Sequence, residues 1–322
     1  MPLHDVGYRP WEGTKSPLAT RWLVIASTGV RLAFRSTWLS RTLILTWVPA
    51  IVFGVLFFFY EQSLVDRQFQ QPIQGILMSS GMSMELVQSY MQDPEGARHL
   101  VWSTLLLTFF RYPQAIFMLV VVAMVAPKLI AYDLRNRGYL LYFSRPIQLA
   151  GYIAGKICIV ATFLALMTTI PALVLYVVGL SLSPDRTVVL LTWDLPIRIL
   201  IASLCLMIPT ASVALACSSI TIQTRYAALS WFAVWIVGWV SYSVLRIGEL
   251  ARNAGGGGPP DLMRESDWEL LSPFHVLGRV QQYIFGLYPE ENNVLPYFIV
   301  LISVTLIALT VICWRIRARL RA

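Results

Sequence analysis

Long apolar runs separated by short polar segments dominate this chain. Six of the runs approach the length of about 20 residues that an α-helix needs to cross a bilayer. We predict spans over approximately 43–60, 113–132, 152–180, 197–220, 227–247 and 295–314. The second is the least regular, because Arg111 interrupts an apolar run that begins near Val101. The pattern predicts an all-α, polytopic integral membrane protein whose residues 1–322 form a single transmembrane domain.

Composition and charge agree with this interpretation and orient the chain. Of the 322 residues, 57% are hydrophobic and 13% are charged, which is more apolar surface than a soluble protein of this size could bury. If both termini are cytoplasmic, the inner segments hold 16 of the 25 basic residues and three of the 17 acids. Short loops on the cytoplasmic side of a membrane carry an excess of basic residues. The distribution of the basic residues behind the net charge of +8 therefore predicts how the chain is oriented in a cell membrane, and does not indicate nucleic-acid binding.

A helical pattern runs from Ser16 to Arg41, ahead of the first span. Its arginines and its apolar residues fall on neighbouring arcs at about 100° per residue. We expect an amphipathic helix at the inner membrane surface, with its arginines facing either lipid phosphates or a protein partner.

The predicted outer loops cover residues 61–112 and 248–294. The first contains a methionine-rich segment that could cap the outer face or line an exit path. The second has enough apolar residues to dip back towards the membrane or to pack on the outer helix ends. The fourth span is rich in small residues, which predicts a close-packing face within the subunit or across a dimer.

Residues for catalysis or metal binding are sparse. The chain has three histidines, His4, His99 and His275, with no HExxH or GxSxG motif and no carboxylate pair placed for acid–base work. The four cysteines lie inside apolar runs without the spacing of a metal site. We therefore predict no catalytic, cofactor or metal site, and no enzyme activity of the chain's own.

The segment Gly151–Ile157, GYIAGKI, faintly resembles a phosphate-binding loop. One residue is missing between the glycines and no Ser or Thr follows the lysine, so we do not expect it to bind ATP. Gly151 and Gly155 instead predict a helix-packing notch, with Lys156 extending to the membrane surface.

Charges are also scarce at the predicted bilayer midplane. Pumps and ion-coupled transporters place ionisable residues there. Here the nearest candidates cluster at the outer ends of the spans: Arg111, Asp194, Arg198 and Arg246. Because a proton or sodium relay has no evident members, energy for any transport must come from another polypeptide.

The segment between the second and third spans is unusually rich in aromatic and basic residues. Its core, GYLLYFSRP, is apolar, aromatic and flanked by arginines, as expected of a short cytoplasmic helix that inserts into a groove on a partner protein. The alternative is an interfacial helix that lies on lipid headgroups.

The stretch Ala126–Lys156, APKLIAYDLRNRGYLLYFSRPIQLAGYIAGK, resembles the corresponding loop of ATP-binding-cassette (ABC) permeases of the type-2 exporter class. In that family an acidic residue follows the second span, a short coupling helix ends in a Leu…(Ser)-Arg-Pro pattern, and Gly-Lys opens the third span. The matching positions here are Asp133, Leu140–Phe143, Ser144-Arg145-Pro146 and Gly155-Lys156. The N-terminal helix, the six spans and the last outer loop also match. The larger first outer loop and the glycine insertion 255–258 depart from the family.

The resemblance implies a permease that forms half of an efflux transporter. Two copies, identical or different, would pair in the lipid bilayer, and each would dock its coupling helix, within the cytoplasmic loop 133–150, on a separate ATPase subunit that binds ATP and Mg. Closure of the ATPases would switch the spans from inward- to outward-facing. The implied transmission contacts are Asp133, Arg135, Arg137, Tyr142, Arg145 and Pro146, with secondary contacts from Arg21, Arg31 and Arg35.

Two other functions stay open at this stage. The chain could use ATP-driven motion to act on an outer-face partner without transporting a substrate, a role that its outer loops could serve. A membrane enzyme acting on lipids is the third possibility, although no nucleophile–base or metal constellation supports it.

Overall fold

The computed structural model describes residues 20–66, 88, 91–138, 148–183, 187–254, 266–289 and 292–321. In these ranges the regular secondary structure is entirely helical. Six helices of the described chain are long and apolar enough to cross a membrane: Thr37–Val65, Arg98–Arg135, Leu149–Leu182, Val188–Ile220, Thr224–Arg252 and Leu295–Leu320. The predicted fold class, an all-α polytopic membrane protein with six spans, is confirmed.

The N-terminal helix differs from its predicted boundaries. Instead of one helix over 16–41, the described residues form α1 (Arg21–Ala33) and α2 (Thr37–Leu45), which meet at a turn. Ser36 starts the second helix, because its hydroxyl accepts a hydrogen bond from the Leu39 amide at 3.5 Å, as an N-cap residue does. α2 continues into α3 (Val48–Val65), so the first span begins at Thr37.

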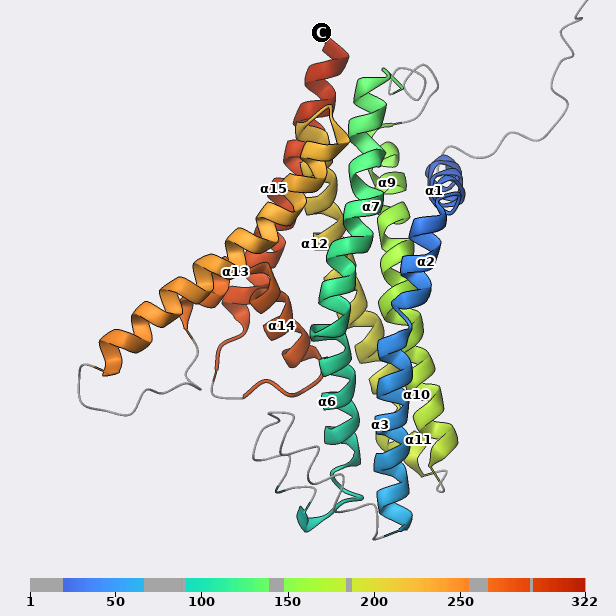
Figure 1. The fold of residues 1–322 in the computed structure, drawn as a ribbon, viewed down its shortest axis with the longest axis vertical. Helices are drawn as coiled ribbons and strands as arrows, with labels where there is room; N and C mark the ends of the chain where they lie inside the picture. Colours follow the sequence, from blue (N-terminus) through green and yellow to red (C-terminus); the bar gives the residue numbers. More distant parts are fainter. Residues whose placement is uncertain are drawn as a thin grey trace, which may run out of the picture.

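One long rod runs through the molecule beside the first span (Figure 1). It consists of α6 (Arg98–Arg111) and α7 (Pro113–Arg135), joined at Tyr112. Pro113 can open α7 because a proline at the start of a helix has no amide to leave unpaired. The helix that carries the second span therefore begins well before the predicted start at residue 113, and its 38 residues are more than a bilayer crossing requires.

The third span is a helix with a local change of winding. α9 (Leu149–Leu164) passes through a π-helical turn, η3 (Ala165–Thr169), into α10 (Ile170–Leu182). Pro171 is the second residue after this turn. A wider turn absorbs the missing amide and the bulk of a proline ring without ending the helix.

The fourth span, α12 (Leu195–Ile220), is preceded by the short helix α11 (Val188–Thr192) and is the most buried of the six spans. It packs on α7, α9, α13 and α15, so its small residues form a close-packing face within the subunit. Just after Pro127, the Ser218 hydroxyl of α12 donates to the Pro127 carbonyl at 3.1 Å and accepts from the amides of Ile130 and Ala131 at 3.2 and 3.0 Å. A neighbouring helix thus supplies hydrogen bonds to the backbone of α7 beside the proline.

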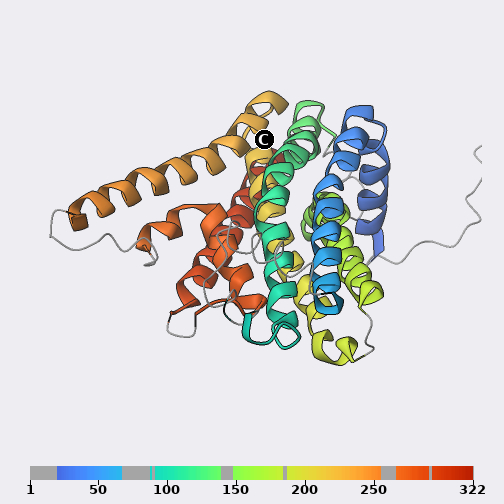
Figure 2. The same ribbon diagram turned by 60° about the horizontal axis from the view of Figure 1, so that its bottom comes forward.

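The last two spans lie to one side of the rod. α13 (Thr224–Ala254) touches α7 near its start and then diverges from the bundle, as Figures 1 and 2 both show. α15 (Leu295–Arg321) packs against α12 and ends beside the start of α13. Between them lie the short helix η4 (Asp267–Leu271) and α14 (Pro273–Ile284). α14 packs on α12, α13 and α15, so this part of the predicted outer loop returns to the bundle.

Candidate coupling site

The end of α7 and the start of α9, which flank the proposed coupling segment, lie at the end of the bundle that also holds α1 and the C-terminus (Figure 1). The segment that carries Tyr142, Arg145 and Pro146 falls outside the described residues. Its two anchors are described: the last turn of α7 and the first turns of α9. The geometry of these anchors decides how motion of the loop would reach the spans.

Asp133 joins the two anchors through a buried ion pair. Its carboxylate lies 2.8 Å from the Lys156 ammonium and accepts a 2.8 Å hydrogen bond from the Tyr152 hydroxyl. The Lys156 and Asp133 side chains are 6% and 15% exposed, and the ammonium also lies 5.3 Å from the Tyr152 ring centroid. Lys156 therefore does not extend to the membrane surface as predicted. A nearby carboxylate compensates the charge where it is buried, which the sequence spacing alone did not reveal.

The backbone after α7 turns back towards Asp133. The Gly138 amide donates to the Asp133 carbonyl at 2.9 Å, and Arg137 adopts a left-handed conformation with φ of 53°. This conformation closes the helix end and redirects the chain into the loop. The end of α7 and the start of α9, which flank the coupling segment, are thus held to each other.

α1 is packed directly on the start of α9. An added Cβ at Gly155 would lie 3.0 Å from both the Ile25 Cβ and the Trp22 carbonyl oxygen, and one at Gly151 would lie 3.9 Å from the Trp22 Cβ. On the α1 side, Gly29 leaves no room for a Cβ beside Ile159. The predicted packing notch at Gly151 and Gly155 is confirmed, and its occupant is α1.

Replacing Gly155 with leucine is expected to push α1 away from α9 and to lower the free energy of unfolding by about 1–3 kcal/mol, the usual cost of overpacking. Thermal unfolding of the purified protein in an uncharged detergent measures this effect. Gly248→Leu is the matched control, because no atom lies within 4 Å of an added Cβ there. Equal stability of the two variants would contradict the close α1–α9 contact.

Arginines are exposed around this end of the bundle. Arg135 and Arg137 follow Asp133, while Arg31 and Arg35 lie at the end of α1 and in the turn after it. Arg21, at the start of α1, is half-buried. The six predicted coupling residues therefore divide into a buried anchor, Asp133, two exposed arginines, and the three residues of the undescribed segment.

The model of the ABC-2 family transporter proteins matches residues 24–314. The chain belongs to the ABC-2 transporter family. No curated protein and no solved structure matches it. The family match agrees with the resemblance of the loop between the second and third spans, and it identifies this ABC-2 protein as a permease component of an ABC transporter.

A set of ion pairs that the sequence did not predict lies at the opposite end of this ABC-2 protein. Glu61 pairs with Arg98 at 3.3 Å and accepts a 3.0 Å hydrogen bond from the Trp102 indole. Asp194 pairs with Arg198 at 2.6 Å and contacts His99 at 3.0 Å. Glu61 with Arg98, and His99 with Asp194, are too far apart in sequence to give a pairing signal, whereas Asp194 and Arg198 are spaced four residues apart and could have been paired from the sequence.

A further cluster surrounds α14. The Arg279 guanidinium binds both oxygens of Glu269 at 2.6 and 2.8 Å, and the Tyr297 hydroxyl donates to the same carboxylate at 3.2 Å. Burial alone would raise the pKa of Glu269, but these hydrogen bonds and the Arg279 charge outweigh it and hold the pKa below its usual value. Glu269 is therefore a fully engaged anion.

His275 lies on α14, and its ring centroid is 3.8 Å from that of Tyr242. Burial, together with the charges of Arg111 and Arg279, lowers its pKa to about 4, although Glu269 acts in the opposite direction. The imidazole is therefore neutral at pH 7, and its Nδ1 has no hydrogen-bond partner among the described residues.

Acidification from pH 6.5 to pH 4 is expected to destabilise this ABC-2 protein through His275. In this range the histidine of the unfolded protein, with a pKa of 6.5, takes up a proton, while that of the folded protein does not. The free energy of unfolding therefore decreases as the pH is lowered. The contribution is about 1–3 kcal/mol. Thermal unfolding from pH 4 to pH 7.5 should show a shallower pH dependence for His275→Phe than for the parent. Identical profiles would contradict the neutral histidine.

Proposed function

We propose that this chain is the permease subunit of an ABC exporter, pairing with a second permease copy and coupling to a separate ATPase subunit through the loop between α7 and α9. Both termini would lie in the cytoplasm, on the side that carries most of the basic residues. Membership of the ABC-2 family supports the permease role and, in general terms, an ABC ATPase partner.

The buried Asp133–Lys156 pair is the observation that carries the coupling proposal. A loop can transmit a push only if its ends move together, and separating this pair would leave two desolvated charges without their partners, which is costly. Asp133 would then act inside the permease as a positioning residue. Direct contacts to the ATPase would come from Arg135, Arg137 and the aromatic and basic segment beyond them.

α1 packs on α9 and would therefore move together with α7 and α9. It packs on α9 through Trp22, Ile25 and Gly29, and Arg31 and Arg35 are exposed at its end. Movement of the loop would therefore move α1, α7 and α9 as one body. Such a body shifts between two discrete arrangements because packed helix interfaces are bistable, and ATP binding need only favour one of them.

Replacing Tyr142 and Arg145 together with alanine tests this proposal. In the permease–ATPase complex reconstituted in liposomes, the double variant should keep ATP hydrolysis but lose at least ten-fold in ATP-dependent transport, since an aromatic anchor and an arginine each contribute about 2 kcal/mol or more at such contacts. The readouts are phosphate release and movement of a fluorescent amphiphile across the same vesicles.

Arg252→Ala is the matched control, because Arg252 is exposed at the far end of α13. It should leave both activities unchanged. Transport by the double variant at the parent rate would refute coupling through this loop.

A second candidate function is transmission of ATP-driven motion to a partner on the outer face. The far end of the first span favours it: the Tyr60 hydroxyl donates to the Pro94 carbonyl at 2.8 Å, and Glu61 pairs with Arg98. Motion of α3 would therefore reach the segment between them. If this candidate is correct, replacing residues 67–90 with a short glycine–serine linker should abolish the effect on the outer-face partner. Any ATP-dependent efflux should continue. Loss of efflux itself would favour the exporter.

A further inference from the structure

Arg111 differs from the other arginines near its end of the bundle. Four of them are each paired with a carboxylate: Arg98 with Glu61, Arg198 with Asp194, Arg246 with Glu249 and Arg279 with Glu269. In the described part of the chain, Arg111 has no carboxylate within 4 Å. Glu269, the carboxylate whose charge acts on Arg111, already binds Arg279 and Tyr297.

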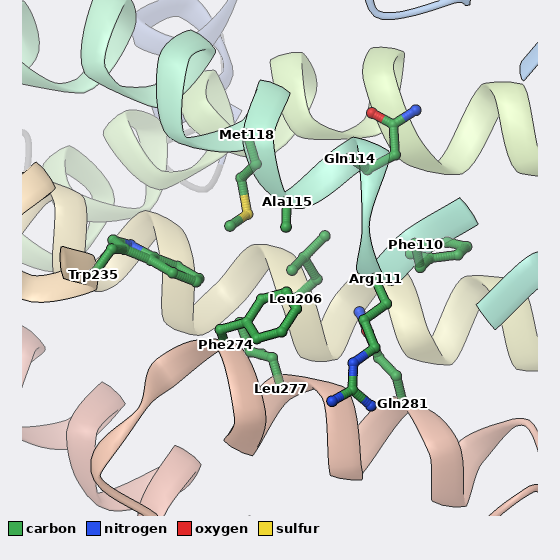
Figure 3. A pocket seen from close by; sticks show the side chains of 10 residues that line it. All are labelled: Phe110, Arg111, Gln114, Ala115, Met118, Leu206, Trp235, Phe274, Leu277 and Gln281. Carbon is green, nitrogen blue, oxygen red and sulfur yellow. The ribbon is translucent and has the colours of Figure 1, made fainter. Parts of the chain in front are cut away.

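The Arg111 guanidinium extends from the end of α6, packs against α14 and lies beside two aromatic rings. Its Cζ is 5.4 Å from the Phe274 ring centroid and 5.8 Å from that of Tyr112. An added Cβ at Gly278 would be 3.0 Å from the Arg111 Cζ, so the absence of a side chain at Gly278 leaves room for the guanidinium. Figure 3 shows Arg111 reaching from the end of α6 towards α14, beside Gln281. A cation in such surroundings favours a nearby anion strongly.

The cavity beside Arg111 presents unpaired donors. The Arg111 Nε and the Trp235 indole nitrogen are buried without a hydrogen-bond partner in the described chain, and both residues line the cavity. Neither of these two nitrogens can accept a hydrogen bond. Gln114 adds one unpaired acceptor to the same lining, its buried side-chain oxygen. The cavity volume is about 20 Å³, enough for a water molecule or the tip of a polar group. Arg111 is half-buried, so part of its side chain is accessible beside the cavity.

An apolar groove continues from this cavity. Trp235 and Leu277 line both, and the groove has a volume of about 120 Å³ between α12, α13, α14 and α15. An engineered apolar cavity of about 150 Å³ holds a benzene molecule, so this groove accommodates a short length of hydrocarbon. Val304 and Leu271 line it and are 42% and 51% exposed, so the groove opens towards the surrounding lipid.

The order of cavity and groove along the spans matches the shape of a membrane lipid. On α12, Leu206 lines the cavity while Pro209 and Val213 line the groove, roughly 5–10 Å further towards the predicted cytoplasmic end. Arg111 lies 17 residues, roughly 25 Å, from the exposed Lys128 at that end. On the topology predicted from the charges, the cation is near the outer boundary of the bilayer and the groove points to its middle.

We propose that this surface binds an amphiphile of the outer leaflet, with an anionic head on Arg111 and a hydrocarbon tail in the groove between α12, α13, α14 and α15. The donors of Arg111 and Trp235 fit phosphate or carboxylate oxygens, and the tail replaces lipid contacts at the groove. This inference depends on the membrane topology but not on coupling to an ATPase, so it can fail while the proposed function stands. It also names the chemical class to test first as a substrate.

Native mass spectrometry of the full-length protein in an uncharged detergent tests the site. Dioleoyl phosphatidylglycerol should bind with one high-affinity copy per chain and at least ten-fold more tightly than dioleoyl phosphatidylcholine, which has the same tails without a net charge. Glycerol 3-phosphate, which has the anionic head alone, should not bind detectably. Equal binding of the two lipids, or binding of the free head group at the same affinity, would overturn the proposal.

Variants separate the two halves of the site. Arg111→Leu should abolish the ten-fold preference, and Val304→Trp, which fills the groove from an exposed position, should weaken phosphatidylglycerol binding at least ten-fold. Arg111→Lys retains the charge and should stay within three-fold of the parent, which keeps the test decisive if Arg111→Leu does not fold. Arg252→Leu, a charge removed elsewhere, should have no effect.

Two results would contradict the assignment directly. Unchanged lipid preference in folded Arg111→Leu would mean that the guanidinium serves only to hold α14. A change of oligomeric state in Val304→Trp, measured by light scattering, without loss of lipid binding would assign the groove to a second copy of the chain.

Discussion

Asp133→Asn is expected to lower the free energy of unfolding by about 3–5 kcal/mol, because it leaves the Lys156 ammonium buried without its counterion. The Lys156 side chain is 6% exposed. Asparagine still accepts the Tyr152 hydroxyl hydrogen bond, so the loss reports the charge and not the hydrogen bond. Denaturation of the purified protein in mixed detergent micelles, followed by tryptophan fluorescence, measures the change.

A double-mutant cycle separates the pair from its surroundings. Adding Lys156→Met to Asp133→Asn removes the unpaired cation and should recover most of the lost stability, since apolar replacement of a whole buried pair is often neutral. Arg135→Gln is the matched control: it removes an exposed charge two residues along α7 and should stay within about 0.5 kcal/mol of the parent. A double variant no more stable than Asp133→Asn would show that the ion pair is not what holds the anchors.

The same cycle bears on the proposed function. If the pair only stabilises the fold, the double variant should transport at the parent rate once its stability is restored. If the pair also holds the loop for coupling, transport per hydrolysed ATP should stay below that of the parent. The ratio of the two rates distinguishes a positioning role from a purely structural one.

Hydrophobic length predicted the six spans because the bilayer imposes it on each helix separately. Local signals also sufficed for the packing notch, where two glycines four residues apart mark one helix face. The division of the N-terminal helix was harder to foresee. Ser36 is a recognisable cap residue, but the apolar pattern continues across it into the first span.

Pairings between distant residues could not be predicted from the sequence. The partners Asp133 and Lys156 are separated by the whole coupling segment, and Glu61 and Arg98 by the first outer segment. Each side chain alone resembles an ordinary interfacial charge. Only the approach of the helices shows which charges are buried together and which, like Arg111, are left without a carboxylate.

Glu61→Gln is expected to destabilise the far end of the first span by about 3 kcal/mol or more, because the Arg98 guanidinium is 6% exposed and would lose its carboxylate. The glutamine oxygen can still accept from the Trp102 indole, whose ring packs edge-on against Phe57 at 5.4 Å. The loss therefore measures the buried charge of Arg98. Chemical denaturation of the purified protein gives the value.

Trp102→Phe is the companion measurement, since it removes the hydrogen bond to Glu61 but keeps a ring in the aromatic cluster. It should cost about 1.5–3 kcal/mol, the range for a hydrogen bond to a charged group. Glu61→Leu combined with Arg98→Leu should restore much of the stability lost in Glu61→Gln, because no unpaired charge is left. If instead the double variant is the least stable of the three, the pair contributes attraction beyond its desolvation cost, and the join between α3 and α6 is electrostatic in origin.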